Sequence, residues 1–284
     1  MERIYLTKKE FKRLKHFYIE EEVANTEANF YYDKNNDEYL FKIYRFKDDK
    51  YLQGKEKTIK DIIESKDLIN IPELILPLKE VFVDNNFRGS IIKRVKGCNT
   101  SLYLNDSFIP LKTKIDILKQ IGTILDKIKN ANPSLNLAFG DVHTDNFMIS
   151  DDKVFGIDTD GMNIFDNKGR INYYLDDKSF IRSIKKYPID DFGLIKASTN
   201  TDIFCFIMMI FDVLTNDKIY RLSLNEYKYY LDYLDKLGFD NKLLTSFASI
   251  YDENIPNISP LPYFDELNRT NDSTILQLKR KNGR

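Results

Sequence analysis

The chain contains 284 residues, of which 42% are hydrophobic and 31% charged, and its formal net charge is −1. These proportions are typical of a folded soluble protein and exclude a globally disordered chain. The near-neutral balance provides no basic field, so we expect neither nucleic acid nor a membrane as a partner. The length fits one two-lobed unit or two small domains.

The sequence also limits where the protein is expected in the cell and whether it binds zinc. The longest apolar stretch, residues 203–214, contains Asp212 and is too short to cross a bilayer, and the amino terminus lacks the apolar segment of a secretory signal. Cys98 and Cys205 form no C-x-x-C motif, and with only two histidines the chain lacks the ligands of a typical zinc site. We therefore expect a cytoplasmic protein with free thiols.

The first 95 residues predict antiparallel strands and one helix. Residues 30–33 and 39–46 are rich in aromatic and aliphatic side chains and flank the tetrad Lys-Asn-Asn-Asp, which is typical of a hairpin. Residues 57–68 carry apolar side chains at helical spacing. Residues 74–83 and 88–95 alternate around Asp-Asn-Asn and predict another hairpin.

The rest of the chain is predicted to be mainly helical. Residues 111–128 place six apolar side chains on one helix face, namely Ile115, Leu118, Ile121, Ile124, Leu125 and Ile128. A second helix, apolar nearly all round, should have Thr201 as its N-cap and end near residue 214. Residues 227–237 and 243–251 predict further helices, and we expect the polar tail from about residue 268 to be flexible.

The most informative stretch lies after the first of these helices. Two short apolar runs, 147–149 and 154–157, flank the polar tetrad Ser-Asp-Asp-Lys and predict a β-hairpin with a four-residue turn. Asp141 and Asn146 precede this hairpin and Asp158 follows it, so the three side chains should converge at its open end. Carboxylate and amide oxygens at one site favour a hard cation, above all Mg²⁺.

This pattern resembles the catalytic loop and metal-binding Asp of the protein-kinase-like superfamily. In that family H-R-D-x4-N is followed by D-F-G. Here Phe-Gly-Asp141 stands in place of H-R-D, Asn146 follows at the right spacing, and Asp158-Thr-Asp160 stands in place of D-F-G. The hairpin between the two motifs makes the resemblance more specific than either motif alone.

The resemblance covers about residues 20–265 and implies an α+β fold with two lobes. The amino lobe, residues 1–94, would contain a small antiparallel β-sheet and one helix and would bind the nucleotide. The carboxyl lobe, residues 95–284, would be mainly helical and would carry the catalytic loop and the metal-binding Asp.

The resemblance also implies roles for individual residues. Asp141 would accept or orient the proton of the acceptor hydroxyl, and Asn146 and Asp158 would hold Mg²⁺ against the phosphates of ATP. Asp160 is close enough in sequence to be a metal ligand too, and either Asp158 or Asp160 suits the main ligand. Lys42, on a predicted strand, matches the V-A-I-K lysine that binds the α- and β-phosphates.

Two more features of the family can be matched. A glutamate of the helix after this strand should pair with Lys42, and Glu64 is our choice, with Glu56 as the alternative. The segment that contains Ile92 and Val95 resembles the hinge between lobes, where backbone groups receive adenine.

The sequence departs from the family pattern at the phosphate-binding loop. A G-x-G-x-x-G motif is expected around residues 20–31, yet the first glycine is Gly54, and residues 22–29 are Glu-Val-Ala-Asn-Thr-Glu-Ala-Asn. Glycines let backbone N–H groups approach phosphates closely, whereas a glutamate repels them. This departure indicates an unusual or degenerate kinase.

The catalytic loop itself permits two comparisons. Gly-Asp141-x-His143-x-x-Asn is closer to aminoglycoside- and choline-kinase-like enzymes, with His143 acting in catalysis or only hydrogen-bonding within its loop. The dipeptide Thr201-Asp202 instead resembles the protein-kinase helix whose first-turn Asp anchors the catalytic-loop backbone, although an Asp there also suits the helix dipole. Residues 162–200 occupy the place of activation and substrate-docking segments.

Three functions follow as alternatives. The first is an atypical protein kinase that uses ATP and Mg²⁺ to phosphorylate a Ser, Thr or Tyr hydroxyl of a protein substrate. The second is a phosphotransferase for a small hydroxyl-bearing acceptor, and the third is a nucleotide-binding pseudokinase, which the glycine-free loop favours. The joint presence of Lys42, Asp141, Asn146 and Asp158 favours an enzyme, and the protein kinase is the leading hypothesis.

Overall fold

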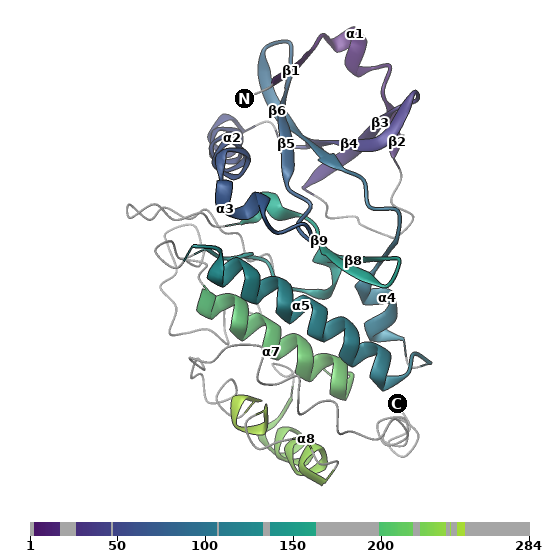
Figure 1. The fold of residues 1–284 in the computed structure, drawn as a ribbon, viewed down its shortest axis with the longest axis vertical. Helices are drawn as coiled ribbons and strands as arrows, with labels where there is room; N and C mark the ends of the chain where they lie inside the picture. The colour runs from purple at the N-terminus through teal and green to yellow at the C-terminus, as the bar shows by residue number, and fades with distance from the viewer. Residues whose placement is uncertain are drawn as a thin grey trace.

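The computed structural model describes residues 3–17, 27–46, 48–106, 108–132, 137–162, 199–217, 222–236, 239 and 243–247. The chain has an α+β fold with a six-stranded sheet, a three-stranded sheet and helices (Figure 1). Most of the expected phosphate loop, most of the segment 162–200 and the tail lie outside the described residues.

The larger sheet has the strand order β1-β5-β6-β4-β3-β2. Its strands are β1 (Arg3–Leu6), β2 (Lys15–Phe17), β3 (Ala28–Asp33), β4 (Asn36–Tyr44), β5 (Pro77–Val83) and β6 (Asn86–Lys93). The β3–β4 and β5–β6 pairs confirm both predicted hairpins. Strands β1 and β2, joined through helix α1 (Lys8–Phe11), are not predicted, because three or four residues are too few to show alternation. Since β1 is parallel to β5, the sheet is mixed and not purely antiparallel as expected.

The predicted hairpin in the centre of the chain is confirmed as β8 (Phe147–Ser150) and β9 (Lys153–Gly156). Its turn is shorter than expected, because the strands pair as far as the residues on either side of Asp151 and Asp152. Both turn residues have left-handed backbone, with φ of 49° and 61°. Two positive φ values characterise the type I′ turn, whose twist suits a hairpin and which Asp tolerates better than most residues.

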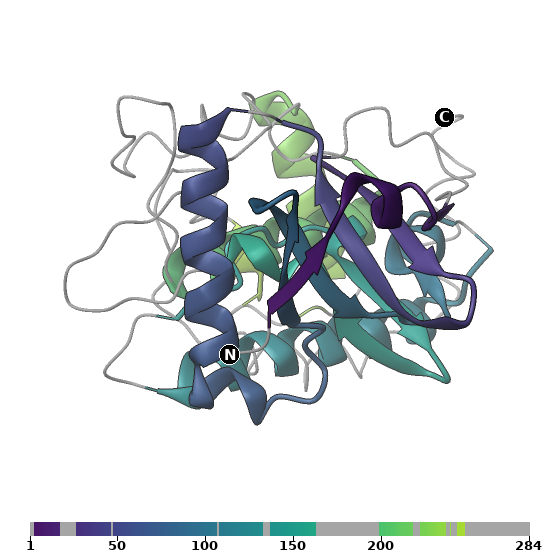
Figure 2. The same cartoon turned by 90° about the horizontal axis from the view of Figure 1, so that it is seen from above.

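Helix α2 (Asp49–Glu64) packs against strands β5 and β6 (Figure 2). It begins eight residues before the predicted helix 57–68, because the Asp48 side chain caps it by accepting a backbone N–H at 2.8 Å. The predicted helix is also interrupted at Ser65, which has extended backbone and caps the short helix α3 (Lys66–Ile69).

The remaining helices confirm most of the helical predictions. They are α4 (Thr100–Asn105), α5 (Leu111–Ala131), α7 (Thr199–Thr215) and α8 (Leu224–Lys236). Helix α7 begins before Thr201, so Thr201 lies inside the helix and is not its N-cap. Residues 243–247 are helical, and the rest of the predicted helix 243–251 is outside the described residues.

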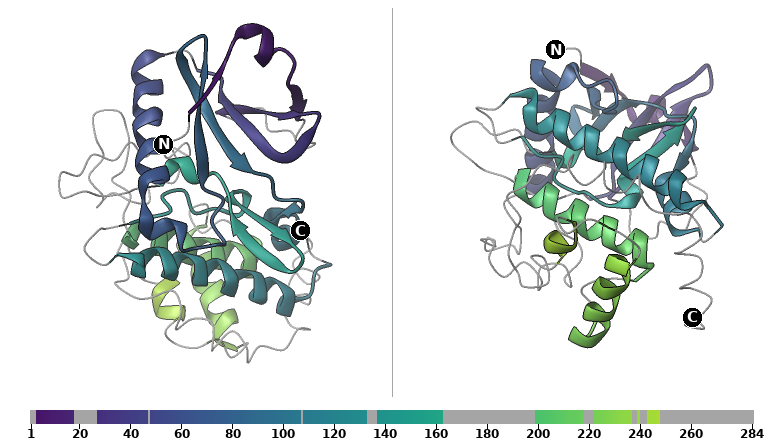
Figure 3. Two further views of the ribbon diagram at one scale, coloured as in Figure 1. Left: turned by 45° about the horizontal axis from the view of Figure 1, so that its top comes forward. Right: turned by 60° about the horizontal axis from the view of Figure 1, so that its bottom comes forward.

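Buried apolar side chains form two clusters. Among the described residues, the larger cluster surrounds α5 and α7, and the smaller one lies between α2 and the larger sheet. Helices α5 and α7 lie side by side (Figures 1 and 3). Within the described parts of the chain, no helix combines the length and the apolar character that a membrane span requires.

The three-stranded sheet, formed by β7 (Cys98–Asn99), β8 and β9, lies between the larger sheet and the helices α5 and α7 (Figure 3). From α5, the Gln120 side chain accepts the N–H of Val154 at 3.0 Å and donates to the carbonyl of Asp152 at 3.1 Å. On the opposite side, the N–H of Ile75 donates to the carbonyl of Gly156 at 2.9 Å. These bonds fix the β8–β9 hairpin, and with it the residues before and after it.

Candidate functional site

The loop before β8 is held by α7. The carboxylate of Asp202, in the first turn of that helix, accepts the backbone N–H groups of Phe139 at 2.6 Å and Gly140 at 2.9 Å. The hydroxyl of Thr199 donates to the carbonyl of Leu137 at 3.2 Å. Asp202 therefore anchors the loop backbone, which is the arrangement that the kinase resemblance implies, in addition to suiting the helix dipole.

The charge of Asp202 is constrained by its surroundings. Burial raises the pKa of this carboxyl to about 7, although the two backbone donors lower it, and the charge of Asp141 raises it further.

Gly140, directly before Asp141, has a φ of 91°, a backbone region that favours glycine.

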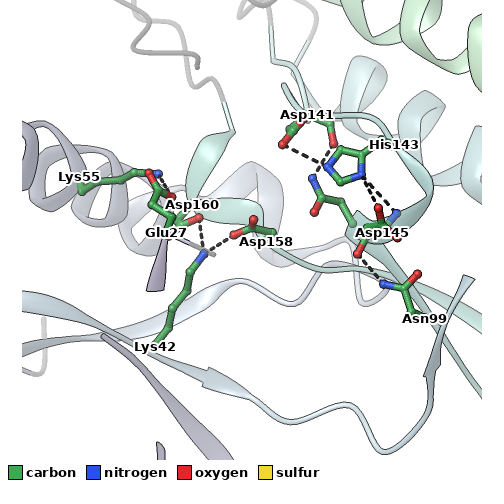
Figure 4. A network of polar contacts seen from close by, with 10 residues as sticks. Glu27, Lys42, Lys55, Asn99, Asp141, His143, Asp145, Asp158 and Asp160 are labelled. Carbon is green, nitrogen blue, oxygen red and sulfur yellow. Dashed lines mark hydrogen bonds and ion pairs between the residues drawn. The ribbon is translucent and has the colours of Figure 1, made fainter. Parts of the chain in front are cut away.

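The same loop is held from the side of α4. The hydroxyl of Thr100 donates to the carbonyl of Thr144 at 2.6 Å, and the side-chain amide of Asn99 donates to the carbonyl of Asp145 at 2.7 Å (Figure 4). Helices α4 and α7 thus fix the loop at both of its ends, and the catalytic candidates between them sit on a rigid backbone.

The expected convergence of Asp141, Asn146 and Asp158 is supported by backbone contacts. The side-chain amide of Asn146 donates to the carbonyl of Asp141 at 2.9 Å. The carbonyl of Asn146 accepts the N–H of Ile157, the residue before Asp158, at 2.9 Å. The open end of the hairpin therefore brings the backbones of these residues together, whereas the carboxylate of Asp158 pairs with Lys42.

His143 lies between two carboxylates. Its Nε2 is 3.4 Å from Asp141 Oδ2, and its Nδ1 is 3.6 Å from Asp145 Oδ2 (Figure 4). In a neutral ring, Nδ1 accepts the backbone N–H of Asp145 at 3.2 Å. Burial lowers the pKa of His143, but the hydrogen bonds and charges of Asp141 and Asp145 outweigh it and raise the pKa to about 10. The raised pKa favours the protonated ring at neutral pH, whereas only the neutral ring accepts the N–H of Asp145 at Nδ1.

Lys42 meets the end of the hairpin from the larger sheet. It lies on β4, is 5% exposed, and forms ion pairs with Asp158 and with Asp160, whose Oδ1 is 2.8 Å from its Nζ (Figure 4). Burial lowers the pKa of Lys42, but the two carboxylates outweigh it and raise the pKa above its usual value. The hydroxyl of Tyr44, on the same strand, donates to Asp160 Oδ2.

The two carboxylates differ in environment. The side chain of Asp158 is 42% exposed, whereas that of Asp160 is 3% exposed. Asp158 also has left-handed backbone, with φ 58° and ψ 37°, and starts the 3₁₀ turn Thr159–Gly161 that carries Asp160. Although burial raises the pKa of Asp160, Lys42 and Lys55 hold it well below the usual range of a carboxyl.

Lys55 is a member of the site that the sequence reasoning missed. From α2 its Nζ pairs with Glu27 at 2.9 Å (Figure 4), and it lies over the ring of Tyr44, 5.5 Å from the centroid. Burial lowers the pKa of Lys55, but Asp160 and Glu27 raise it above its usual value. Once the start of α2 is known, the helical spacing indicates this position, because Lys55 lies three residues after buried Leu52 and four before buried Ile59.

The expected pair between Glu64 and Lys42 does not form. Among the described residues, the ion-pair partners of Lys42 are Asp158 and Asp160, and Glu64 is exposed at the end of α2. Because α2 begins early, its apolar stripe turns Lys55 toward the site and Glu64 toward solvent. The alternative, Glu56, is half-buried beside Lys55 and does not pair with Lys42 either.

The expected hinge residues lie where β6 leaves the larger sheet. Ile92 is half-buried and pairs with Leu40 of β4, and Val95 is half-buried in the segment that connects β6 to β7. Within the described part of the chain, the backbone N–H and carbonyl of Val95 make no hydrogen bond.

The donor set suits Mg²⁺ in part. No group of three or more His, Cys, Asp or Glu side chains in the described ranges is arranged to hold a metal ion. Mg²⁺, however, is commonly held by one or two carboxylates together with substrate phosphates and waters. Asp158, which is half-exposed, and the side-chain oxygen of Asn146, which accepts no hydrogen bond from the described residues, fit that requirement.

A scan against protein-family models and a search of curated protein sequences give no match for this chain. The functional interpretation therefore depends on the geometry of the site and on the sequence pattern.

Proposed function

We propose that this chain is an ATP- and Mg²⁺-dependent phosphotransferase with the two-lobed architecture of the protein-kinase-like superfamily. The observation that carries the proposal is the ion pair between Lys42 and Asp158, which are 116 residues apart in the chain. The resemblance assigns Lys42 to the phosphates and Asp158 to the metal. Because the metal binds the same phosphates, both roles require that the two side chains lie close together.

The two clusters of buried side chains support the two-lobed arrangement. The smaller cluster belongs to α2 and the larger sheet, within the proposed amino lobe of residues 1–94. The larger cluster is formed mainly by helices of the proposed carboxyl lobe, residues 95–284. Lys42 meets Asp158 and Asp160 where these parts meet, at the kind of position where ligands bind in other two-domain enzymes.

The chemistry follows from the charges at this position. Mg²⁺, when bound with ATP, neutralises phosphate charge and orients the γ-phosphoryl group. Asp158 and Asn146 would hold the ion, and Lys42 would move its Nζ from Asp158 to the phosphates. Asp141 would orient the acceptor hydroxyl, and the imidazolium of His143 would supply a positive charge close to it.

We assign the acceptor to a Ser, Thr or Tyr hydroxyl of a protein substrate. The contact from Asp202 to the backbone of Phe139 and Gly140 supports this assignment, because the resemblance to protein kinases includes this anchoring Asp. The position of His143 between Asp141 and Asp145 favours the second candidate, a phosphotransferase for a small hydroxyl-bearing molecule.

The test is incubation of the purified protein with γ-labelled ATP and Mg²⁺, alone and with a cell lysate, beside the variants Asp158→Ala and Asp116→Ala. Asp116 of α5, whose side chain is 48% exposed, serves as the matched control. Label on protein that Asp158→Ala abolishes and Asp116→Ala preserves would support the protein kinase. Label transferred only to small molecules would select the second candidate. Nucleotide binding without transfer would make the protein a pseudokinase and contradict the proposed activity.

A further inference from the structure

We propose that Asp160 is the positioning residue that holds the Lys42 ammonium, and that Asp158 alone exchanges its contact with Lys42 for Mg²⁺. This inference rests on the proposed function and deepens it, because it assigns separate roles to two carboxylates that the sequence leaves interchangeable. It also gives Asp160 the task that the family resemblance assigns to a glutamate of the helix.

Both oxygens of Asp160 are already engaged. Oδ1 accepts from Lys42 Nζ at 2.8 Å, and Oδ2 accepts from the hydroxyl of Tyr44. Its side chain is 3% exposed, so replacement of either contact by a hydrated ion would require the site to open. A metal ion that keeps several waters therefore has no access to Asp160 in this arrangement.

Asp158 has the opposite properties. Its side chain is 42% exposed, and its ion-pair partner within the described residues is Lys42. The carboxylate is therefore open to solvent on one side and held by Lys42 on the other. An ion that approaches with ATP can replace Lys42 at Asp158 while the buried contact between Lys42 and Asp160 is kept.

The charges explain why Lys42 needs a second carboxylate. A divalent cation on Asp158 repels the lysine ammonium that it displaces. Asp160 keeps an anion beside Lys42 after this exchange, so that the ammonium stays where the phosphates arrive. Without Asp160, and with the cation on Asp158, Lys42 would have neither of its present ion-pair partners.

Helix α2 secures this arrangement with a cation. Lys55 reaches from α2 toward Asp160 and pairs with Glu27 (Figure 4), while its ammonium lies over the ring of Tyr44. A glutamate at the position of Lys55 would place another negative charge beside Asp160. A positive charge on α2, in place of the glutamate that the resemblance implies, is therefore consistent with the buried carboxylate of Asp160.

Metal binding separates the two roles without reference to activity. Mn²⁺, a spectroscopic substitute for Mg²⁺, is titrated in the presence of ATP and detected by electron paramagnetic resonance for wild type, Asp158→Asn, Asp160→Asn and the control Asp116→Asn. We expect the Mn²⁺ Kd to rise about tenfold or more in Asp158→Asn, because a ligand is lost, and to change less than about threefold in Asp160→Asn. Equal weakening in both variants would overturn the inference.

Kinetics test the positioning role. Loss of Asp160 should lower kcat for phosphoryl transfer about tenfold or more while the Mn²⁺ affinity is preserved, because a misplaced Lys42 fails mainly in the transition state. A wild-type kcat in a folded Asp160→Asn variant would contradict the role.

Tyr44→Phe provides the second variant, since it removes the hydroxyl contact to Asp160 and keeps every charge. It should lower kcat about threefold or more without changing Mn²⁺ affinity, and an unchanged kcat would overturn the inference even if Asp160→Asn does not fold.

The outcomes also separate this inference from the proposed function. A wild-type protein that binds neither Mn²⁺ nor ATP would overturn both proposals. A wild-type protein that binds both and transfers phosphate, with Asp160→Asn indistinguishable from Asp158→Asn in Mn²⁺ binding, would overturn only the role of Asp160.

Discussion

The carboxylate of Asp202 accepts a hydrogen bond from the backbone N–H of Gly140 at 2.9 Å, although the two residues are 62 positions apart in the chain. A second bond, from Phe139, ends on the same carboxylate. One side chain of α7 therefore holds the backbone directly before Asp141.

Replacement of Asp202 should destabilise the protein. Asp202→Ala leaves two buried N–H groups without an acceptor, and each such group costs about 1–3 kcal/mol, so we expect a loss of about 2–6 kcal/mol in the free energy of unfolding. Urea denaturation measures this loss, with Asp116→Ala as a surface control that should stay within about 0.5 kcal/mol of wild type. An Asp202→Ala variant as stable as the control would show that the contact does not hold the loop.

Stability should also depend on pH through this group. Burial raises the pKa of Asp202 to about 7, so the folded state binds the proton more tightly than the unfolded state does. The stabilisation that this proton provides is complete below about pH 4 and is lost as the pH rises to about 7. Asp202→Asn does not titrate. We therefore expect the stability of wild type relative to Asp202→Asn to fall by an amount on the order of 4 kcal/mol between these pH values and then to stay level. A constant difference between the two proteins would contradict the raised pKa.

His143 should titrate far from the usual range of histidine. Hydrogen bonds and charges from Asp141 and Asp145 raise its pKa to about 10 against the opposing effect of burial, so the ring should stay protonated at neutral pH. NMR titration of the ring protons measures this value, and His16, the only other histidine, is identified from a His16→Gln variant. Asp145→Asn should lower the pKa of His143, because it removes one of the two carboxylates, whereas Asp116→Asn should not. A pKa of His143 near 6.5 in wild type would contradict this picture.

Gly89 should be required for the position of Lys42. A Cβ atom added to Gly89 would lie 1.8 Å from the carbonyl oxygen of Lys42, so that β6 and β4 would have to separate. Gly89→Ala should lower the free energy of unfolding by about 1–3 kcal/mol and weaken ATP binding. Gly161→Ala is the matched control for stability, because an added Cβ there meets nothing within 4 Å. Thermal and urea denaturation compare the two, and equal stability of the variants would contradict the close approach of the strands.

The local elements were predictable because their causes are local. The apolar face of α5 and the two runs that form β8 and β9 follow from side-chain periodicity and turn residues, which act over a few positions. The approach of Asp141, Asn146 and Asp158 followed from the same hairpin, since antiparallel strands bring their outer ends together.

The start of α2 was not predicted, and the wrong boundary led to a wrong ion-pair partner for Lys42. Placing the helix at residues 57–68 left Lys55 out of it and made Glu64 the only reasonable partner of Lys42 within it. The Asp48 cap begins the helix earlier, and the apolar stripe then turns Lys55 inward and Glu64 outward. Helix boundaries depend on cap contacts that a periodic pattern does not contain.

The sequence by itself determined the hairpin, the main helices and the residues that gather at the end of the hairpin, because these depend on neighbours in the chain. Only the tertiary structure decided which charges pair with Lys42, that β1 lies parallel to β5, and that Asp160 is buried while Asp158 is exposed. Contacts between residues more than a hundred positions apart depend on how complete elements pack, and the cost of burying each charge is set only by the environment which that packing creates.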